Sequence, residues 1–197
     1  MSPVSKEVAV PGRPRRADAR RNYDGLVEQA KIVFAESGAD ASLDEIARRA
    51  GVASGTLYRH FPTRLDLVEV VLAEQIAALV ELGRGLLAAP DALDGLSEWL
   101  RAAIMHGLTY RGLSAAVLSS ALERDAELVA AWHGEMFDVG AALLARARSS
   151  GAIVDDTDDG DVLRMIGAIA SAAQDGPDGV ARADRLLALL LNGLRRR

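Results

Sequence analysis

Polar side chains crowd one short stretch of the chain, residues 55–61. Its spacing is helical, with Leu57 and Phe61 four residues apart on one side. The other side carries two hydroxyls, a guanidinium and an imidazole, from Thr56, Tyr58, Arg59 and His60. Groups of these kinds form hydrogen bonds with phosphate oxygens and with base edges in DNA grooves. The pattern therefore predicts a short helix that contacts nucleic acid.

The residues just upstream predict a second short helix that positions this one. Ser42 and Glu45 have the spacing of a capping box, in which each side chain satisfies an exposed backbone N–H at a helix start. Gly51 follows where a helix ends with positive φ, and Pro62 stops the second helix. Two short helices joined by a glycine turn form a helix-turn-helix, whose second helix fits the major groove. A hairpin buried in a core is the alternative, but it would not need a helix faced with donors.

Charge is divided unevenly along the chain. The net charge is −5, yet Lys and Arg outnumber Asp and Glu by 11 to 8 in residues 1–64 and are outnumbered 12 to 20 in residues 65–197. Basic side chains gather in the first 21 residues, at Lys6, Arg13, Arg15, Arg16, Arg20 and Arg21. A basic arm before an acidic body indicates a polyanionic partner at the N-terminal part only. A disordered, solubilising tail is the other interpretation of the arm.

The remaining sequence has helical periodicity and no long strand-like alternation, so the fold class is all-α. A first helix buries one face and closes near Gly38, and a longer helix capped by Thr63 is expected to run to a break at Gly83 and Gly85. Further helices are predicted at about 93–110, 114–124, 126–149 and 161–174, and after a turn at 175–179.

Enzymatic chemistry finds little support in the sequence. The chain has no cysteine, its three histidines lack helical metal-ligand spacing, and no glycine-rich phosphate loop follows a strand. We therefore expect no catalysis, no metal and no cofactor. The sequence has neither the apolar core of a signal peptide nor a run long enough to cross a membrane. A soluble, cytoplasmic protein without a membrane partner is expected.

Residues 22–72 closely resemble the TetR family of transcriptional regulators. The resemblance rests on Phe-Ala-Glu-Ser-Gly at 34–38, on Ser-Leu-Asp-Glu-Ile-Ala-Arg-Arg-Ala-Gly-Val at 42–52, and above all on Gly-Thr-Leu-Tyr-Arg-His-Phe at 55–61. Beyond residue 80 only the all-helical pattern is similar. The resemblance implies an all-helical homodimer that holds DNA with its N-terminal third and a small effector with the rest.

The same resemblance implies roles for single residues. The positions of Thr56, His60 and Arg64 usually hold phosphates in such proteins. The residues nearest the bases are Ser54, Gly55, Tyr58 and Arg59, and Asp44 sits near the groove. The family's usual serine before the recognition helix is Ala53 here, so the common cap is lost unless Ser54 replaces it. The usual lysine that opens the fourth helix is Arg64, which can bind phosphate bidentately. Arg48 and Arg49 are interpreted as a solvated face.

The last helix predicts a second subunit. Residues 186–191 are apolar all round, and such a helix must be covered on both sides. The preceding helix is rich in small residues that allow close helix approach, namely Gly167, Ala168, Ala170, Ser171, Ala172 and Ala173. Together the two helices look like the dimer face of TetR regulators. Complete burial within one subunit is the alternative.

Scarce aromatic side chains predict an effector pocket in the second half of the chain. Trp99, His106 and Tyr110 form one helical stripe, and Trp132 and Met136 belong to another. Side chains that are wide, apolar and polar at the tip suit the lining of a mostly apolar pocket. A plain core with a satisfied histidine is the alternative.

Three segments and one function follow from these patterns. We expect a basic arm at 1–21, a helix-turn-helix DNA-binding domain at 22–66, and a helical effector-binding and dimerisation domain at 67–197. The predicted function is a ligand-responsive repressor that binds a palindromic, inverted-repeat operator as a homodimer and releases it when a small, mostly apolar molecule binds. Whether the effector induces or co-represses is left open. A constitutive DNA-binding protein without an effector is the alternative.

Overall fold

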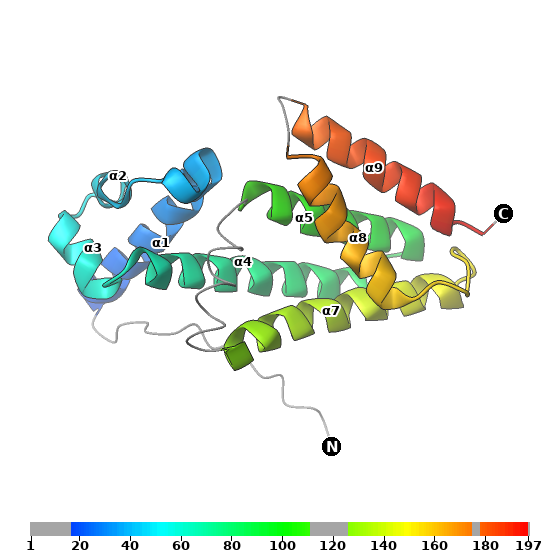
Figure 1. The fold of residues 1–197 in the computed structure, drawn as a ribbon. Coiled ribbons are helices and arrows are strands. Elements are labelled where there is room, and N and C mark those ends of the chain that lie inside the picture. Colours follow the sequence, from blue (N-terminus) through cyan, green and yellow to red (C-terminus); the bar gives the residue numbers. More distant parts are fainter. Residues whose placement is uncertain (1–16, 111–125, 175–177, 197) are drawn as a thin grey trace, which may run out of the picture. The chain divides into compact units, whose positions relative to one another are not determined.

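The computed structural model describes residues 17–110, 126–174 and 178–196, and these are helical apart from turns and one isolated bridge between Ile153 and Arg195 (Figure 1). The all-α class is confirmed. In chain order the elements are α1 (Ala17–Ser37), the 3₁₀ helix η1 (Gly38–Asp40), α2 (Leu43–Arg49), α3 (Ser54–His60), α4 (Arg64–Leu86), α5 (Ala92–Thr109), α7 (Ala126–Ser149), α8 (Asp159–Ala172) and α9 (Gly179–Leu194).

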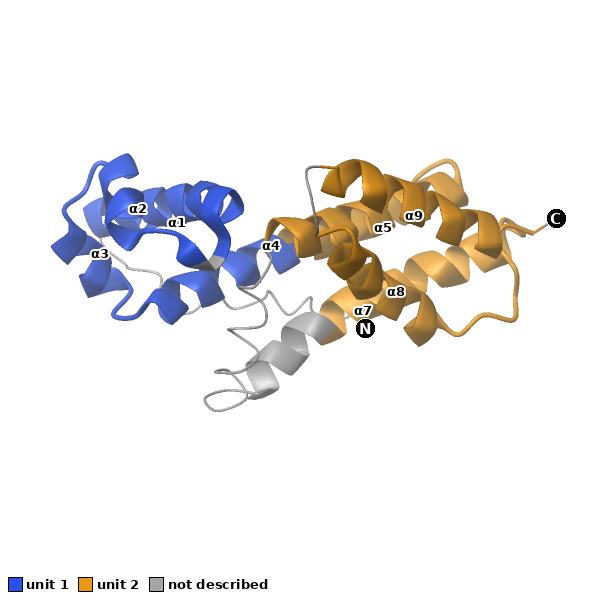
Figure 2. Ribbon diagram, turned by 45° about the horizontal axis from the view of Figure 1, so that its top comes forward, with its two compact units in different colours: residues 1–77, 112–125 blue, residues 78–111, 126–197 orange. Residues whose placement is uncertain are grey.

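The chain divides into two compact units (Figure 2). Unit 1 contains residues 1–77 and 112–125, and unit 2 contains residues 78–111 and 126–197. Helix α4 is continuous across the division, so its first part belongs to unit 1 and its last part to unit 2. The functional boundary expected after residue 66 stays a prediction.

Unit 1 packs α1, α2 and α3 around a core that their apolar spacing defines. The predicted face of α1 is buried, with Leu26, Ala30 and Phe34 completely covered, and Ile46 of α2 and Leu57 of α3 are also covered. This core fixes α3 from its inner side and leaves its outer side to solvent.

Local signals at the helix ends of unit 1 match the sequence-based expectations. Gly38 and Gly51 have φ of 57° and 70°, the left-handed values that glycine adopts without steric penalty. The Ser42 hydroxyl accepts the Glu45 N–H at 3.3 Å at the start of α2. Thr63 caps α4, because its hydroxyl accepts the Asp66 N–H at 3.2 Å while Asp66 accepts the Thr63 N–H at 2.7 Å.

Unit 2 packs α5 against α7, α8 and α9. Trp99 of α5 is completely buried, and its indole N–H donates to the Leu79 carbonyl of α4 at 3.1 Å. A Cβ at Gly83 of α4 would lie 2.7 Å from the Trp99 indole nitrogen, and one at Gly140 of α7 would lie 2.7 Å from the far side of its ring. Both glycines therefore leave the space that the indole fills.

The expected break at Gly83 and Gly85 is wrong. Helix α4 continues to Leu86. Gly83 does not end the helix; its lack of a side chain leaves room for Trp99 and Val139. The actual end is capped from another helix: the Arg146 guanidinium of α7 donates to the carbonyls of Leu86 and Ala89.

Other expected boundaries shift by a residue or two. The helix expected at about 93–110 is Ala92–Thr109, and 126–149 is confirmed as α7. Helix α8 begins at Asp159 rather than 161, because Asp158 accepts the Asp161 N–H at 3.0 Å and so caps the helix earlier. The helix expected at 114–124 lies outside the described residues. None of the described helices is long and apolar enough to cross a bilayer.

We expect Gly83→Ala to destabilise the protein, since the added Cβ would lie 2.2 Å from Val139 Cγ1 and 2.7 Å from the Trp99 nitrogen. Overpacking of this kind costs about 1–3 kcal/mol. Gly85→Ala is the matched control in the same helix, because its Cβ would meet nothing within 4 Å. That variant should gain up to about 1 kcal/mol from helix propensity. Urea unfolding of both variants checks this, and equal stability would contradict the packing account.

Candidate nucleic-acid interface

Helices α2 and α3 form the predicted helix-turn-helix, joined by a turn at residues 50–53. Leu57 and Phe61 anchor α3 with 0% and 2% of their surface exposed. Ala53 is the N-cap residue and provides no side-chain bond, so the family's serine cap is indeed absent and Ser54 is simply the first helical residue. Burial rather than capping therefore holds α3 in place.

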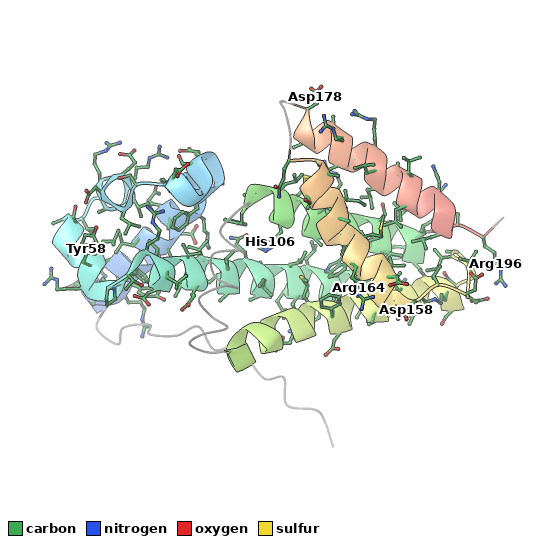
Figure 3. The ribbon with its side chains drawn as sticks, in the orientation of Figure 1. Tyr58, His106, Asp158, Arg164, Asp178 and Arg196 are labelled. Carbon is green, nitrogen blue, oxygen red and sulfur yellow. The ribbon has the colours of Figure 1, made fainter. Side chains whose placement is uncertain are left out.

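The outer side of α3 presents the polar groups that the sequence placed there. Tyr58 is 48% exposed (Figure 3), Arg59 is exposed, and Thr56 is half-buried. The Arg59 side chain lies back along its own helix, with Nε–H donating to the Gly55 carbonyl at 3.2 Å and Nη2 donating to the Thr56 hydroxyl at 2.9 Å. The face combines two hydroxyls with a guanidinium held in one orientation.

His60 is held by aromatic neighbours at the end of α3. Its ring lies edge-on to Tyr23 of α1, with centroids 6.0 Å apart and planes at 79°, and Tyr23 packs against Phe61 at 5.0 Å. Only 2% of Tyr23 is exposed. Tyr23 thus orients His60, a role that sequence reasoning missed. The sequence signal for this role was the position of Tyr23, which lies three residues before Leu26 on the buried face of α1.

The other predicted DNA-contacting residues lie in the first turn of α3 and on α2 and α4. Ser54 is half-buried and Gly55 exposed, and Asp44 is exposed in the first turn of α2. Arg64 is exposed at the start of α4, where its guanidinium donates to the Ala41 carbonyl. Arg64 therefore also joins α4 to the segment before α2, a structural contact that the sequence did not predict.

Arg48 and Arg49 belong to an ion-pair network on α2. Glu45 accepts from Arg48 at 2.7 Å and from Arg49 at 2.8 Å, and Arg49 reaches Glu36 of α1 at 2.9 Å. The hydrogen bonds from Arg48 and then Arg49 lower the pKa of Glu45 from 4.5 to about 2. The network neutralises most of the arginine charge, as expected for a solvated helix face.

The residues predicted to line an effector pocket lie in unit 2. Trp99 is fully buried, Tyr110 is buried, and His106 (Figure 3) and Met136 are half-buried. The His106 and Tyr110 rings are 5.3 Å apart and tilted by 48°. The Trp132 side chain lies outside the described residues. In the described part of the chain, no three His, Asp or Glu side chains gather closely enough to hold a metal ion.

Helices α8 and α9 leave apolar side chains uncovered. Met165 is 43%, Val180 54% and Leu189 67% exposed, although each is a large hydrophobic residue. The small residues of α8 and its C-cap differ in exposure: Gly167, Ala168, Ser171 and Ala172 are exposed, whereas Ala170 and the C-cap residue Ala173 are buried. Ala170 faces α5, where a Cβ at Gly107 would lie 2.9 Å from its own.

Family models cover most of the chain in two parts. Residues 26–71 match the model described as bacterial regulatory proteins of the tetR family. Residues 91–196 match the model described as the C-terminal domain of SbtR-like transcriptional regulators. The chain belongs to the TetR family of bacterial regulators.

Solved structures of TetR regulators share the fold. The regulator SCO0520 from Streptomyces coelicolor is 35% identical with a TM-score of 0.72, covering 87% of this chain and 97% of that one. A TetR regulator from Mycobacterium vanbaalenii is 28% identical with a TM-score of 0.64, covering 93% of this chain and all of that one.

Two curated relatives are similar only in the DNA-binding part. The uncharacterized HTH-type regulator TtgW and the HTH-type regulator SrpR, both of Pseudomonas putida, are each 39% identical over 64 residues, 32% of this chain. The match spans 48% of the length of TtgW and 30% of the length of SrpR. The protein is therefore a helix-turn-helix transcriptional regulator of the TetR family.

We expect acid to remove the contribution of Glu45 to stability. A carboxylate whose pKa is lowered on folding stabilises the native state fully above its ordinary pKa of 4.5, and the effect disappears as the pH falls toward about 2. The effect is small because the pair is exposed. Urea unfolding of wild type and Glu45→Gln from neutral to acid pH should show a difference that shrinks on acidification. Glu98→Gln, at an exposed carboxylate, is the control. A stability difference between wild type and Glu45→Gln that stays constant with pH would contradict the expected loss of the Glu45 contribution.

Proposed function

We propose that this TetR regulator is a repressor that binds an inverted-repeat operator as a homodimer and responds to a small, mostly apolar effector. The observation that carries the proposal is the α3 surface, where Thr56, Tyr58 and Arg59 lie on the outer side of a helix whose inner side is buried. Such a helix fits the major groove, which is wide enough to admit it.

The proposed contacts divide into base-reading and backbone-holding groups. Base contacts come from Ser54, Gly55, Tyr58 and Arg59, and phosphate contacts from Thr56, His60 and Arg64, with Asp44 near the groove. The exposure of Tyr58 and Arg59 supports the first group. The position of His60 at the end of α3, oriented by Tyr23, supports the second.

A homodimer is proposed through the outer faces of α8 and α9. Exposed apolar side chains on adjacent helices are characteristic of protein interfaces, and Met165, Val180 and Leu189 provide them. Exposed small residues on α8 permit close approach of a second helix. The buried residues Ala183, Leu187 and Leu194 cover the opposite side of α9 within the same chain.

The effector is proposed to bind in unit 2 beside His106, Tyr110 and Met136, with Trp99 and Trp132 completing the set. Trp99 has no exposed surface, so an effector that contacts it must displace core neighbours. The absence of Lys and Arg from these stripes disfavours a strongly anionic effector. Binding must favour one conformation over another to change operator affinity, and typical couplings of 1–3 kcal/mol correspond to roughly 5- to 150-fold.

A constitutive DNA-binding protein without an effector is the second candidate. This candidate gives unit 1 the same DNA-binding role as the first one, and it differs only in that unit 2 binds no effector. An operator affinity that no small apolar compound changes would favour it. A cytoplasmic location is proposed for either function.

We expect Tyr58→Ala to relax sequence preference, because each base contact contributes about 1–3 kcal/mol of discrimination. His60→Ala should weaken binding to all DNA sequences alike, since a phosphate contact carries no sequence information. Binding titrations with the operator and with single-base variants separate the two effects. Arg84→Ala, which removes an exposed arginine of α4 in unit 2, is the control and should bind normally. If a Tyr58→Ala, Arg59→Ala double variant bound its operator normally, α3 would not be the reading helix.

We expect the protein to sediment as a dimer without DNA. Leu189→Glu should give monomers or insoluble chain, because it puts charge at the most exposed large apolar side chain among the described residues. Ala145→Glu on the exposed side of α7 is the matched control and should remain dimeric. A monomeric wild-type species at micromolar concentration would refute the interface.

A further inference from the structure

The Arg59 guanidinium uses one edge for its own helix. Nε–H and Nη2–H lie on the same edge of the planar group, and they donate to the Gly55 carbonyl and the Thr56 hydroxyl at 3.2 and 2.9 Å. The acceptors stand four and three residues earlier, so both lie on the face of α3 that carries Arg59. The side chain is therefore fixed in direction before any DNA arrives.

The second edge of the guanidinium, formed by Nη1 and Nη2, remains available. In the part of the chain that the structure describes, Arg59 has no acidic partner, in contrast to Arg48 and Arg49 on α2. A Cβ at the neighbouring Gly55 would meet nothing within 4 Å, so the surface beside Arg59 is open. Two parallel N–H groups on an exposed surface match the O6 and N7 acceptors of guanine.

We propose that Arg59 reads a guanine in each operator half-site and that Thr56 is a positioning residue which holds Arg59 for this contact. The inference rests on the proposed function, because it deepens the DNA contact of α3. A guanidinium that is already oriented loses less conformational entropy on binding than a free one. Discrimination at that base pair thus depends on Thr56 as well as on Arg59.

The Thr56 hydroxyl can serve two partners at once. Its oxygen has two lone pairs and one O–H, so it accepts from Arg59 while its hydrogen remains available for a phosphate oxygen. Removal of the hydroxyl therefore has two consequences: weaker binding to all sequences and a loss of guanine preference. Only the second consequence is specific to the positioning role.

The test begins with selection of preferred duplexes from a randomised library by the full-length protein. Each guanine of the preferred half-site is then replaced by 7-deazaguanine, which lacks the N7 acceptor, and the two affinities are compared. The affinity of the wild-type protein should fall roughly tenfold when one particular guanine is replaced, which is within the range of a bidentate contact. Arg59→Ala should show no such loss. Arg48→Ala, which removes an exposed arginine from α2, should behave as wild type.

The Thr56 variants test the positioning role separately. Thr56→Val, which keeps the shape without the hydroxyl, should reduce the ratio of guanine to 7-deazaguanine affinity, and Thr56→Ser should restore it. The proposal is overturned if the half-site contains no guanine, if wild type tolerates 7-deazaguanine everywhere, or if Thr56→Val keeps the full ratio. An Arg59→Ala variant that is uniformly weaker with the ratio intact would make Arg59 a phosphate contact. Selection of no preferred duplex at all would instead contradict the proposed function.

Discussion

The packing of one indole organises unit 2 of this regulator. Trp99 fills space that Gly83 of α4 and Gly140 of α7 leave open, and its N–H is satisfied by the Leu79 carbonyl. A buried indole needs such a partner, because an unpaired buried donor costs about 1–3 kcal/mol. Three helices thus meet at one side chain, and neither glycine tolerates a larger residue without movement of its neighbours.

Helix α4 belongs to both units and is tied within each. Its first part is tied within unit 1, where Glu74 meets Lys31 of α1 at 2.9 Å and Arg64 bonds the Ala41 carbonyl. Its last part is tied within unit 2 by Trp99 and by Arg146, which donates to the Leu86 carbonyl at 3.3 Å. Under the proposed function, a change in the packing of Trp99 would act on this one continuous helix, Arg64–Leu86. Under the proposed function, this continuity is what an effector uses.

Local sequence signals predicted the helices of both units well and the contacts between distant residues poorly, for a physical reason. The capping serine Ser42, the positive-φ Gly51 and the buried pair on α3 act within a few residues, so their spacing is visible in the sequence. The role of Gly83 is not, because it depends on Trp99 and Val139, which are distant in the chain. The same holds for the contact of Arg64 with Ala41 and for the aromatic support of His60 by Tyr23. The orientation of Arg59 toward Thr56 is local in sequence, yet rotamer choice decides it and spacing alone does not.

The central claim is that two copies of α3 enter the major groove on one face of a palindromic site. A hydroxyl-radical and methylation-interference footprint of the wild-type protein on its selected duplex tests this directly. The account predicts two symmetric patches of major-groove guanine interference about 10–10.5 base pairs apart, or a multiple of that spacing. A single patch, or uniform backbone protection without any interference at guanines, would contradict it.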